Sequence, residues 1–245
     1  MSRLASLTPS RAPSTPPQAV HTPSSPLKGS ETTYHRKLRL VIGEIRKVVK
    51  SWDELVRDGI KVGRGCVDSA TEMDNILALP ETPERPPITP HFEALYTSRT
   101  ALESVLTKLD KSLHRLSLLV DQAETLYFEA YAHMGATFCL VEIQWATWTM
   151  DHLVNTLPAL VSQHNQHLSQ LTLLSRVLLS SESTFDESKL ALETWLYLSR
   201  GGDRWEAVRE WEELVDFELA PQGGMEDDDE DEYVSKRGKK KAKGR

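Results

Sequence analysis

The chain has 245 residues, 39% of them hydrophobic and 27% charged, and its formal net charge is −7. This length suffices for one ordered domain with tails, and it argues against a large enzyme. The two cysteines, Cys66 and Cys139, fit neither a metal knuckle nor a disulfide framework and indicate a reducing compartment. No apolar run approaches the roughly 20 residues of a membrane span. The N-terminus also lacks the apolar core of a signal peptide, so we expect a soluble intracellular protein without membrane association.

The charge is segregated along the sequence. Residues 1–30 carry +3, residues 226–232 carry −7 and residues 236–245 carry +7, which leaves −10 for the rest of the chain. An acidic body repels phosphates, so we expect no direct binding of nucleic acid by the folded part.

The N-terminal residues 1–30 are rich in Ser, Thr and Pro, contain few large apolar side chains and are expected to be disordered. Thr8 and Ser25 in this tail, and Thr82 further on, each precede a proline and have a basic residue three positions after the hydroxyl. Cyclin-dependent kinases phosphorylate this pattern, so the three residues are predicted phosphorylation sites. The alternative is a chance match, which Ser/Pro-rich segments readily generate.

The first helical pattern begins at about residue 32, and its apolar stripe continues at helical spacing through residue 77. The opposite face of residues 36–50 is basic. Such a face suits contact with acidic lipid or nucleic acid, or a solvated surface turned toward the acidic body. Gly59 is predicted to cap this helix or to lie in a kink, so residues 36–78 form one bent helix or two.

Five prolines in residues 80–90 exclude helix and strand and predict a linker. Residues 91–133 then form the helix around which the rest is organised. Its apolar residues follow one another by alternating steps of four and three, which is the a/d seam of a coiled coil. The seam consists of Leu102, Leu106, Leu109, Leu113, Leu116, Val120, Ala123, Tyr127 and Ala130. A helix of this length needs antiparallel helices of the same chain, a second protein, or both, to bury its stripe.

Residues 135–144 are apolar and partly β-branched, which allows a strand. Because no second strand candidate exists, a buried connector or a continued helix is the preferred interpretation. Another long amphipathic helix covers residues 145–178, and Pro158 kinks it or marks its start. His164 and His167 lie one turn apart in it and could bind a metal. No acidic or sulfur ligand is near them in the sequence, so we expect exposed polar residues and no metal site.

Two short helices are predicted at 185–198 and 205–217, separated by the pair Gly201-Gly202. Within 17 residues they carry Trp195, Trp205 and Trp211. Two short helices cannot bury three indoles against themselves. The tryptophans are therefore candidates for partner contact, with a cap on the end of the bundle as the alternative.

Beyond Pro221 an acidic run precedes a basic one, and both are expected to be disordered. Opposite charge blocks are typical of nuclear and nucleolar tails. The basic block is a predicted nuclear localisation signal, with a merely solubilising end as the alternative. Its basic residues are Lys236, Arg237, Lys239, Lys240, Lys241, Lys243 and Arg245. We expect a nuclear protein, the nucleolus included, with a cytoplasmic pool.

The sequence contains no glycine-rich phosphate loop, nucleophile elbow, H-E-x-x-H motif or carboxylate pair in a plausible cleft. We therefore expect neither catalysis nor a cofactor. The predicted fold is all-α, an elongated antiparallel helical bundle or coiled coil over residues 31–220 with disordered tails at 1–30 and 221–245. The seam of its central helix is either plain bundle core or an intermolecular contact.

Two blocks of the chain match a known family together. The first, residues 37–75, contains the run WDELVRDGI between two amphipathic helical stretches. The second contains WATW at 145–148 and LETWL at 192–196, on either side of a long leucine-rich helix. In this order, around a central coiled coil and behind a Ser/Thr-Pro tail, they resemble the cyclin-dependent kinase 2-interacting protein family (CINP). The AIRIM ribosome maturation factors are similarly built. The chain differs from the pattern in residues 80–90 and after Trp205.

The resemblance implies a non-enzymatic nuclear adaptor linked to cyclin-dependent kinase, DNA replication and checkpoint signalling. It also implies partners: an AAA-ATPase complex that serves pre-60S ribosome maturation and replisome protein turnover, an AIRIM-like subunit, and a cyclin-dependent kinase. One alternative function is a structural coiled-coil subunit of a kinetochore-like or tethering complex. Another is a kinase substrate whose core only displays the tail.

Overall fold

A computed structural model of the chain describes residues 32–220. Every regular element within these residues is a helix, which confirms the predicted all-α bundle. The tails predicted to be disordered lie outside the described residues. No helix in the described part is both long enough and apolar enough to cross a membrane.

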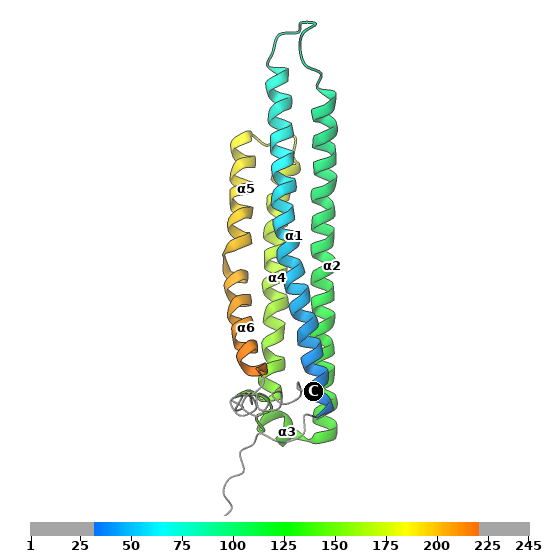
Figure 1. Ribbon diagram of the computed structural model, residues 1–245, viewed down its shortest axis with the longest axis vertical. Helices are drawn as coiled ribbons and strands as arrows, with labels where there is room; N and C mark the ends of the chain where they lie inside the picture. Colours follow the sequence, from blue (N-terminus) through cyan, green and yellow to red (C-terminus); the bar gives the residue numbers. More distant parts are fainter. Residues whose placement is uncertain (1–31, 221–245) are drawn as a thin grey trace, which may run out of the picture. The chain divides into compact units, whose positions relative to one another are not determined.

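The helices form a bundle with four positions, and two short helices share the fourth (Figure 1). The first three positions are filled by α1 (Thr33–Leu77), α2 (Thr89–Met134) and α4 (Met150–Leu179). The fourth is filled by α5 (Phe185–Arg200) followed by α6 (Asp203–Leu219). Each position is antiparallel to its neighbours: α1 packs against α2 and α5, and α4 packs against α2, α5 and α6. This arrangement buries the apolar stripe of each long helix on two neighbouring helices.

Residues 33–77 form one helix, which decides between the one-helix and two-helix alternatives. It begins with a capping box in which the Thr32 side chain accepts from the backbone N–H of His35, and the His35 side chain accepts from that of Thr32. Gly59 neither caps nor ends α1. It is a buried position in the helix where a tryptophan of α5 lies against the backbone.

The central helix α2 starts two residues before its predicted beginning and ends one residue after its predicted end. Its buried residues are Leu95, Leu102, Val105, Leu109, Leu116, Val120, Ala123, Leu126 and Ala130. Three residues of the predicted seam, Leu106, Leu113 and Tyr127, are only partly buried. The stripe differs from the 3.5-residue seam because α2 packs against both α1 and α4, and because a straight helix drifts about 20° per heptad from that repeat.

The connection between α2 and α4 contains the five-residue helix α3 (Ala136–Leu140). It starts at Gly135, whose φ of 89° favours glycine. The prediction of a buried connector is correct only for Phe138 and Cys139, because Val141 and Ile143 are exposed beyond the last turn. A strand is absent from this described segment.

The helix α4 begins at Met150 rather than at residue 145, with the Thr149 side chain accepting from the backbone N–H of His152. Pro158 therefore lies inside the helix and does not mark its start.

Two apolar clusters make up the interior. The lower cluster, as oriented in Figure 1, joins the first half of α1, the second half of α2, the first half of α4, and α6. The upper one joins the middle of α1, the first half of α2, the second half of α4, and α5. Between α5 and α6, at the level where the clusters meet, the chain breaks at Gly201-Gly202.

Candidate functional site

A buried polar cluster lies where the two apolar clusters meet. Arg204, at the start of α6, donates from Nη1 to Asp53 of α1 and from Nε to Nε2 of His164 on α4, the latter at 3.4 Å. His164 Nδ1 lies 2.7 Å from the carbonyl oxygen of Leu160. Since Nε2 accepts from Arg204, Nδ1 carries the proton and donates to that carbonyl. One guanidinium thus joins three helices.

His167, one turn further along α4, has the opposite tautomer. Its Nδ1 accepts from Nε1 of Trp52 at 3.1 Å, so its proton is on Nε2. The Trp52 ring also meets the His164 ring edge to face, with centroids 4.8 Å apart. The expectation that these two histidines are exposed is wrong, because α4 presents them to α1 and α6 rather than to solvent.

Burial keeps both imidazoles neutral. Burial, together with the positive charge of Arg204, lowers the pKa of His164 to about 3 and that of His167 to about 4. Arg204 and Trp52 already donate to the imidazole lone pairs that a metal would need. Among the described residues no group of three or more His, Cys, Asp or Glu side chains is placed to hold a metal ion. The hydrogen bonds of the cluster therefore join α1, α4 and α6.

The structure separates the three tryptophans. Trp195 is fully buried in the upper apolar cluster, and its Nε1 donates to the carbonyl of Val56 at 3.1 Å. Trp211 is buried in the lower cluster. Partner contact is therefore wrong for these two, because α1, α2 and α4 provide the apolar surroundings that two short helices alone lack. Trp205 is half-buried with the guanidinium of Arg209 5.0 Å from its ring centre, and its role in partner contact stays a prediction.

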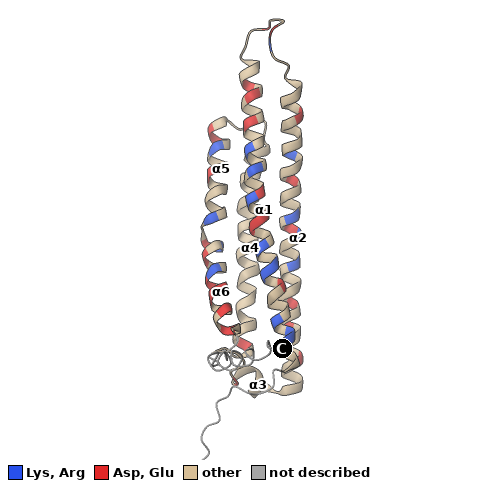
Figure 2. Cartoon of the chain, in the orientation of Figure 1, with Lys and Arg blue, Asp and Glu red and all other residues tan. Residues whose placement is uncertain are grey.

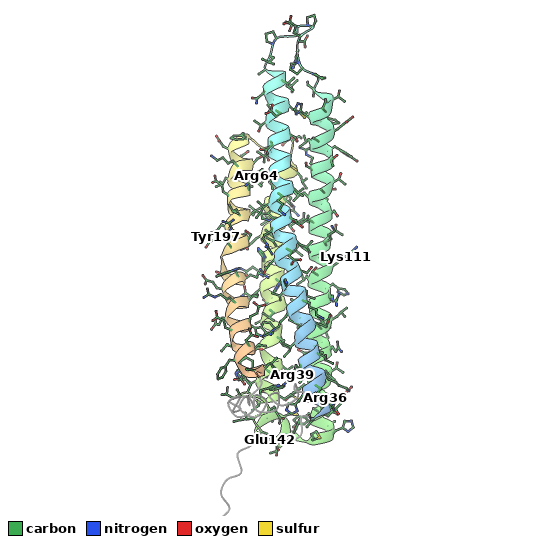
Figure 3. The ribbon with its side chains drawn as sticks, in the orientation of Figure 1. Arg36, Arg39, Arg64, Lys111, Glu142 and Tyr197 are labelled. Atoms are coloured by element: carbon green, nitrogen blue, oxygen red, sulfur yellow. The ribbon has the colours of Figure 1, made fainter. Side chains whose placement is uncertain are left out.

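One end of the α1–α2 pair has no neighbouring helix. The helix α4 ends at Leu179 and α5 begins at Phe185, whereas α1 and α2 continue beyond them as a hairpin (Figure 1). Contacts near this level are at Gly63 of α1, where a Cβ would meet side chains of α4 and α5, and at Arg99 of α2, which donates to the Ser180 carbonyl. Arg64, labelled in Figure 3, lies on α1 at the height of α5.

The stripes that face α4 and α5 continue past these contacts. On α1, successive steps of seven, three and four from Gly63 lead to Ala70, Met73 and Leu77. On α2, successive steps of three and four back from Arg99 lead to Tyr96 and Phe92. Three of them are largely exposed, Leu77 by 55%, Phe92 by 57% and Tyr96 by 68%, while Ala70 and Met73 are half-buried. We call the surface formed by Ala70, Met73, Leu77, Phe92 and Tyr96 the open face.

The hairpin that carries the open face is held together at its tip. Ile76 and Leu95 are buried although no other helix covers them. Arg85 in the connecting segment donates from Nε to the carbonyl of Ile76 at 2.9 Å. This hydrogen bond gives a partner to one of the backbone carbonyls that the C-terminal end of α1 leaves unpaired within the helix. The backbone N–H of Arg85 also donates to the carbonyl of Thr82. The proline-rich linker is therefore a turn, and it presents Thr82 at the surface.

The remaining predicted sites lie outside the described residues. These are the phosphorylation candidates Thr8 and Ser25 and the basic block of the C-terminal tail.

Sequence reasoning missed two features, and each left a signal. Arg204 and Glu218 stand in the same stripe of α6 as its buried apolar residues, at steps of three and four, which marks both as buried charges. Glu218 accepts from the backbone N–H groups of Thr147 and Trp148. The open face follows from length, because α1 and α2 have 45 and 46 residues and α4 has only 30.

Comparison with known proteins gives no family assignment. No protein-family model matches the chain. No curated protein matches it significantly. The family suggested by the tryptophan and leucine motifs therefore stays a prediction.

Proposed function

We propose that this protein is a non-enzymatic nuclear adaptor that binds partner proteins through its helices, with the open face as a docking surface. The open face is the observation that supports this function. Elsewhere along the bundle α1 and α2 bury their inward stripes on α4 and α5, but here Leu77, Phe92 and Tyr96 of the same stripes are exposed. Exposed apolar side chains on two packed helices are typical of a site for a helix of another protein.

The resemblance supplies the identity of the proposed partners. We propose that the adaptor belongs to an AAA-ATPase assembly with an AIRIM-like subunit, acting in pre-60S ribosome maturation and in replisome and checkpoint maintenance. A link to cyclin-dependent kinase fits the position of Thr82, which lies exposed in the turn beside the open face.

The test is quantitative affinity capture of the tagged full-length chain from its own cells. The variant Phe92→Ser/Tyr96→Ser removes two exposed anchors of the open face without opening a core. We expect it to lose the AAA ATPase and ribosome maturation factors while its melting temperature stays close to that of the unaltered chain. The matched control is Leu118→Ser, an exposed leucine of α2 outside the open face, which should retain them.

Two outcomes contradict the proposal. If the double variant captures the same partners in the same amounts, the open face is not the docking surface. If the unaltered chain instead captures stoichiometric subunits of a structural complex, the protein is a coiled-coil subunit of that complex.

A further inference from the structure

The hairpin that carries the open face is acidic. Residues 68–98 contain six acidic side chains and one basic one. They are Asp68, Glu72, Asp74, Glu81, Glu84 and Glu93, with Arg85 as the basic residue. Arg85 is turned onto the Ile76 carbonyl and lies 3.9 Å from Glu81, so it does not offset the other carboxylates. Figure 2 shows the acidic positions on the last turns of α1 and at the start of α2.

Two of these charges lie at the edge of the open face. Asp74 is one helical turn from Ala70 and Leu77, and Glu93 is one turn from Tyr96. The helical segment beyond residue 67 of α1 has ten residues and is about 15 Å long, which matches about three turns of a docked helix. Apolar side chains along the middle and carboxylates along the edge complement a helix that is apolar on one face and basic on its flanks.

We infer that the open face binds a basic amphipathic helix of a partner protein, an inference that rests on the proposed adaptor function. Two other occupants fit less well. A second copy of this hairpin would bring a net charge of −5 against another of −5, which opposes association. The chain's own residues 236–245 are basic, but alanine is their only apolar residue, so they cannot fill the apolar centre.

Another depression in the bundle lacks exposed phenylalanine or tyrosine side chains such as Phe92 and Tyr96 of the open face. It lies between α2 and α4, is lined in part by Leu113, Val120 and Val161, and has Asp121 and Glu124 at its edge. Leu113, Val120 and Val161 are buried or half-buried and so give a docked helix little to cover. This groove provides the control in the following test because its rim is also acidic.

The probe is a fluorescent synthetic helix of about 14 residues with leucine at helical spacing and lysine elsewhere, paired with a version in which glutamate replaces every lysine. Fluorescence anisotropy measures the binding of each to the full-length chain. We expect the lysine peptide to bind at least about tenfold more tightly, with the difference shrinking as salt is raised. We expect Phe92→Ser/Tyr96→Ser to weaken its binding about tenfold or more, because both anchors are lost.

Charge variants separate this site from the control groove. Asp74→Lys/Glu93→Lys should remove most of the preference for the lysine peptide, whereas Asp121→Lys should leave it nearly unchanged. Equal binding of the two peptides, or binding that the variants of the open face do not alter, overturns the inference. If the serine double variant nevertheless loses its cellular partners, the adaptor function stands and the partner has a different chemistry.

Discussion

Trp195 and Gly59 are in direct contact across the α5–α1 interface. The ring lies so close to α1 that a Cβ on Gly59 would stand 2.5 Å from Cζ2 of Trp195. The indole N–H donates to the carbonyl of Val56 at the same place. Glycine is required here because only its missing side chain lets a fully buried indole reach the helix backbone.

Gly59→Ala should lower the free energy of unfolding. Overpacking at a well-filled site costs about 1–3 kcal/mol, which exceeds the roughly 1 kcal/mol that alanine gains over glycine as a helix former. Urea denaturation of the full-length chain measures the difference.

Gly43→Ala is the matched control on the same helix. A Cβ at Gly43 would meet nothing within 4 Å, so alanine should raise the free energy of unfolding by about 0.5–1 kcal/mol. Equal effects of the two substitutions would contradict the close contact of Trp195 with α1.

Asp53→Ala should destabilise the bundle more than a surface charge would suggest. The side chain of its partner Arg204 is only 5% exposed, against 38% for Asp53 itself. Removing the carboxylate leaves a buried guanidinium charge without its counter-ion, and we expect a loss of about 3 kcal/mol in thermal or urea unfolding.

The double variant Asp53→Ala/Arg204→Leu checks this explanation. It removes the buried charge together with its partner and should recover part of the lost stability. If the double variant is at least as unstable as Asp53→Ala, uncompensated charge is not the cause.

Lowering the pH should destabilise the protein before its carboxylates titrate. The folded-state pKa values of His164 and His167, about 3 and about 4, are below the usual 6.5. The unfolded chain therefore binds more protons than the folded one as the pH falls from about 6.5 to 4, and the stability present above pH 6.5 is lost in this window. Each histidine contributes a slope of up to about 1.4 kcal/mol per pH unit.

His167→Gln isolates this contribution, because the amide oxygen can still accept from Trp52. Between about pH 6.5 and pH 5 the variant should show a shallower dependence of the urea midpoint on pH. His114→Gln, at an exposed position on α2, should not change the slope. A slope unaffected by His167→Gln would mean that this imidazole titrates normally.

Thr82 should be phosphorylated in proliferating cells, together with Thr8 and Ser25. A phosphate adds about 1.5–2 negative charges next to the open face, so the phosphorylated chain should bind the lysine peptide more tightly at low salt. Phosphate mapping and anisotropy on kinase-treated protein measure both effects, with Thr82→Ala as the control. Absence of phosphate at all three residues would refute the link to a proline-directed kinase.

Deletion of residues 236–245 should shift the protein out of the nucleus. The segment has seven basic side chains among ten residues, which suits the acidic groove of an import receptor. Its one apolar residue offers nothing to a core, so the melting temperature should not change. Fluorescence microscopy of the truncated chain measures the distribution, and continued nuclear accumulation would point to import together with a partner.

The sequence by itself determined that the chain is helical and the order of its long helical stretches, although it left open whether residues 36–78 form one helix or two. Apolar residues at helical spacing specify α1, α2 and α4, because a helix repeats every 3.6 residues whatever it packs against. Prolines in 80–90 and the pair Gly201-Gly202 mark the breaks, because their effects on the backbone are local.

Only the tertiary structure decided which of those residues meet solvent. His164 and His167 look polar in the sequence and are buried, since a guanidinium and an indole from other helices each donate to one ring nitrogen of these imidazoles. Trp195 looks available to a partner and is buried, since Gly59 admits it to α1. The open face depends on α4 and α5 stopping short of the ends of α1 and α2. Burial depends on how distant segments pack against one another, so the periodicity of a single segment does not determine it.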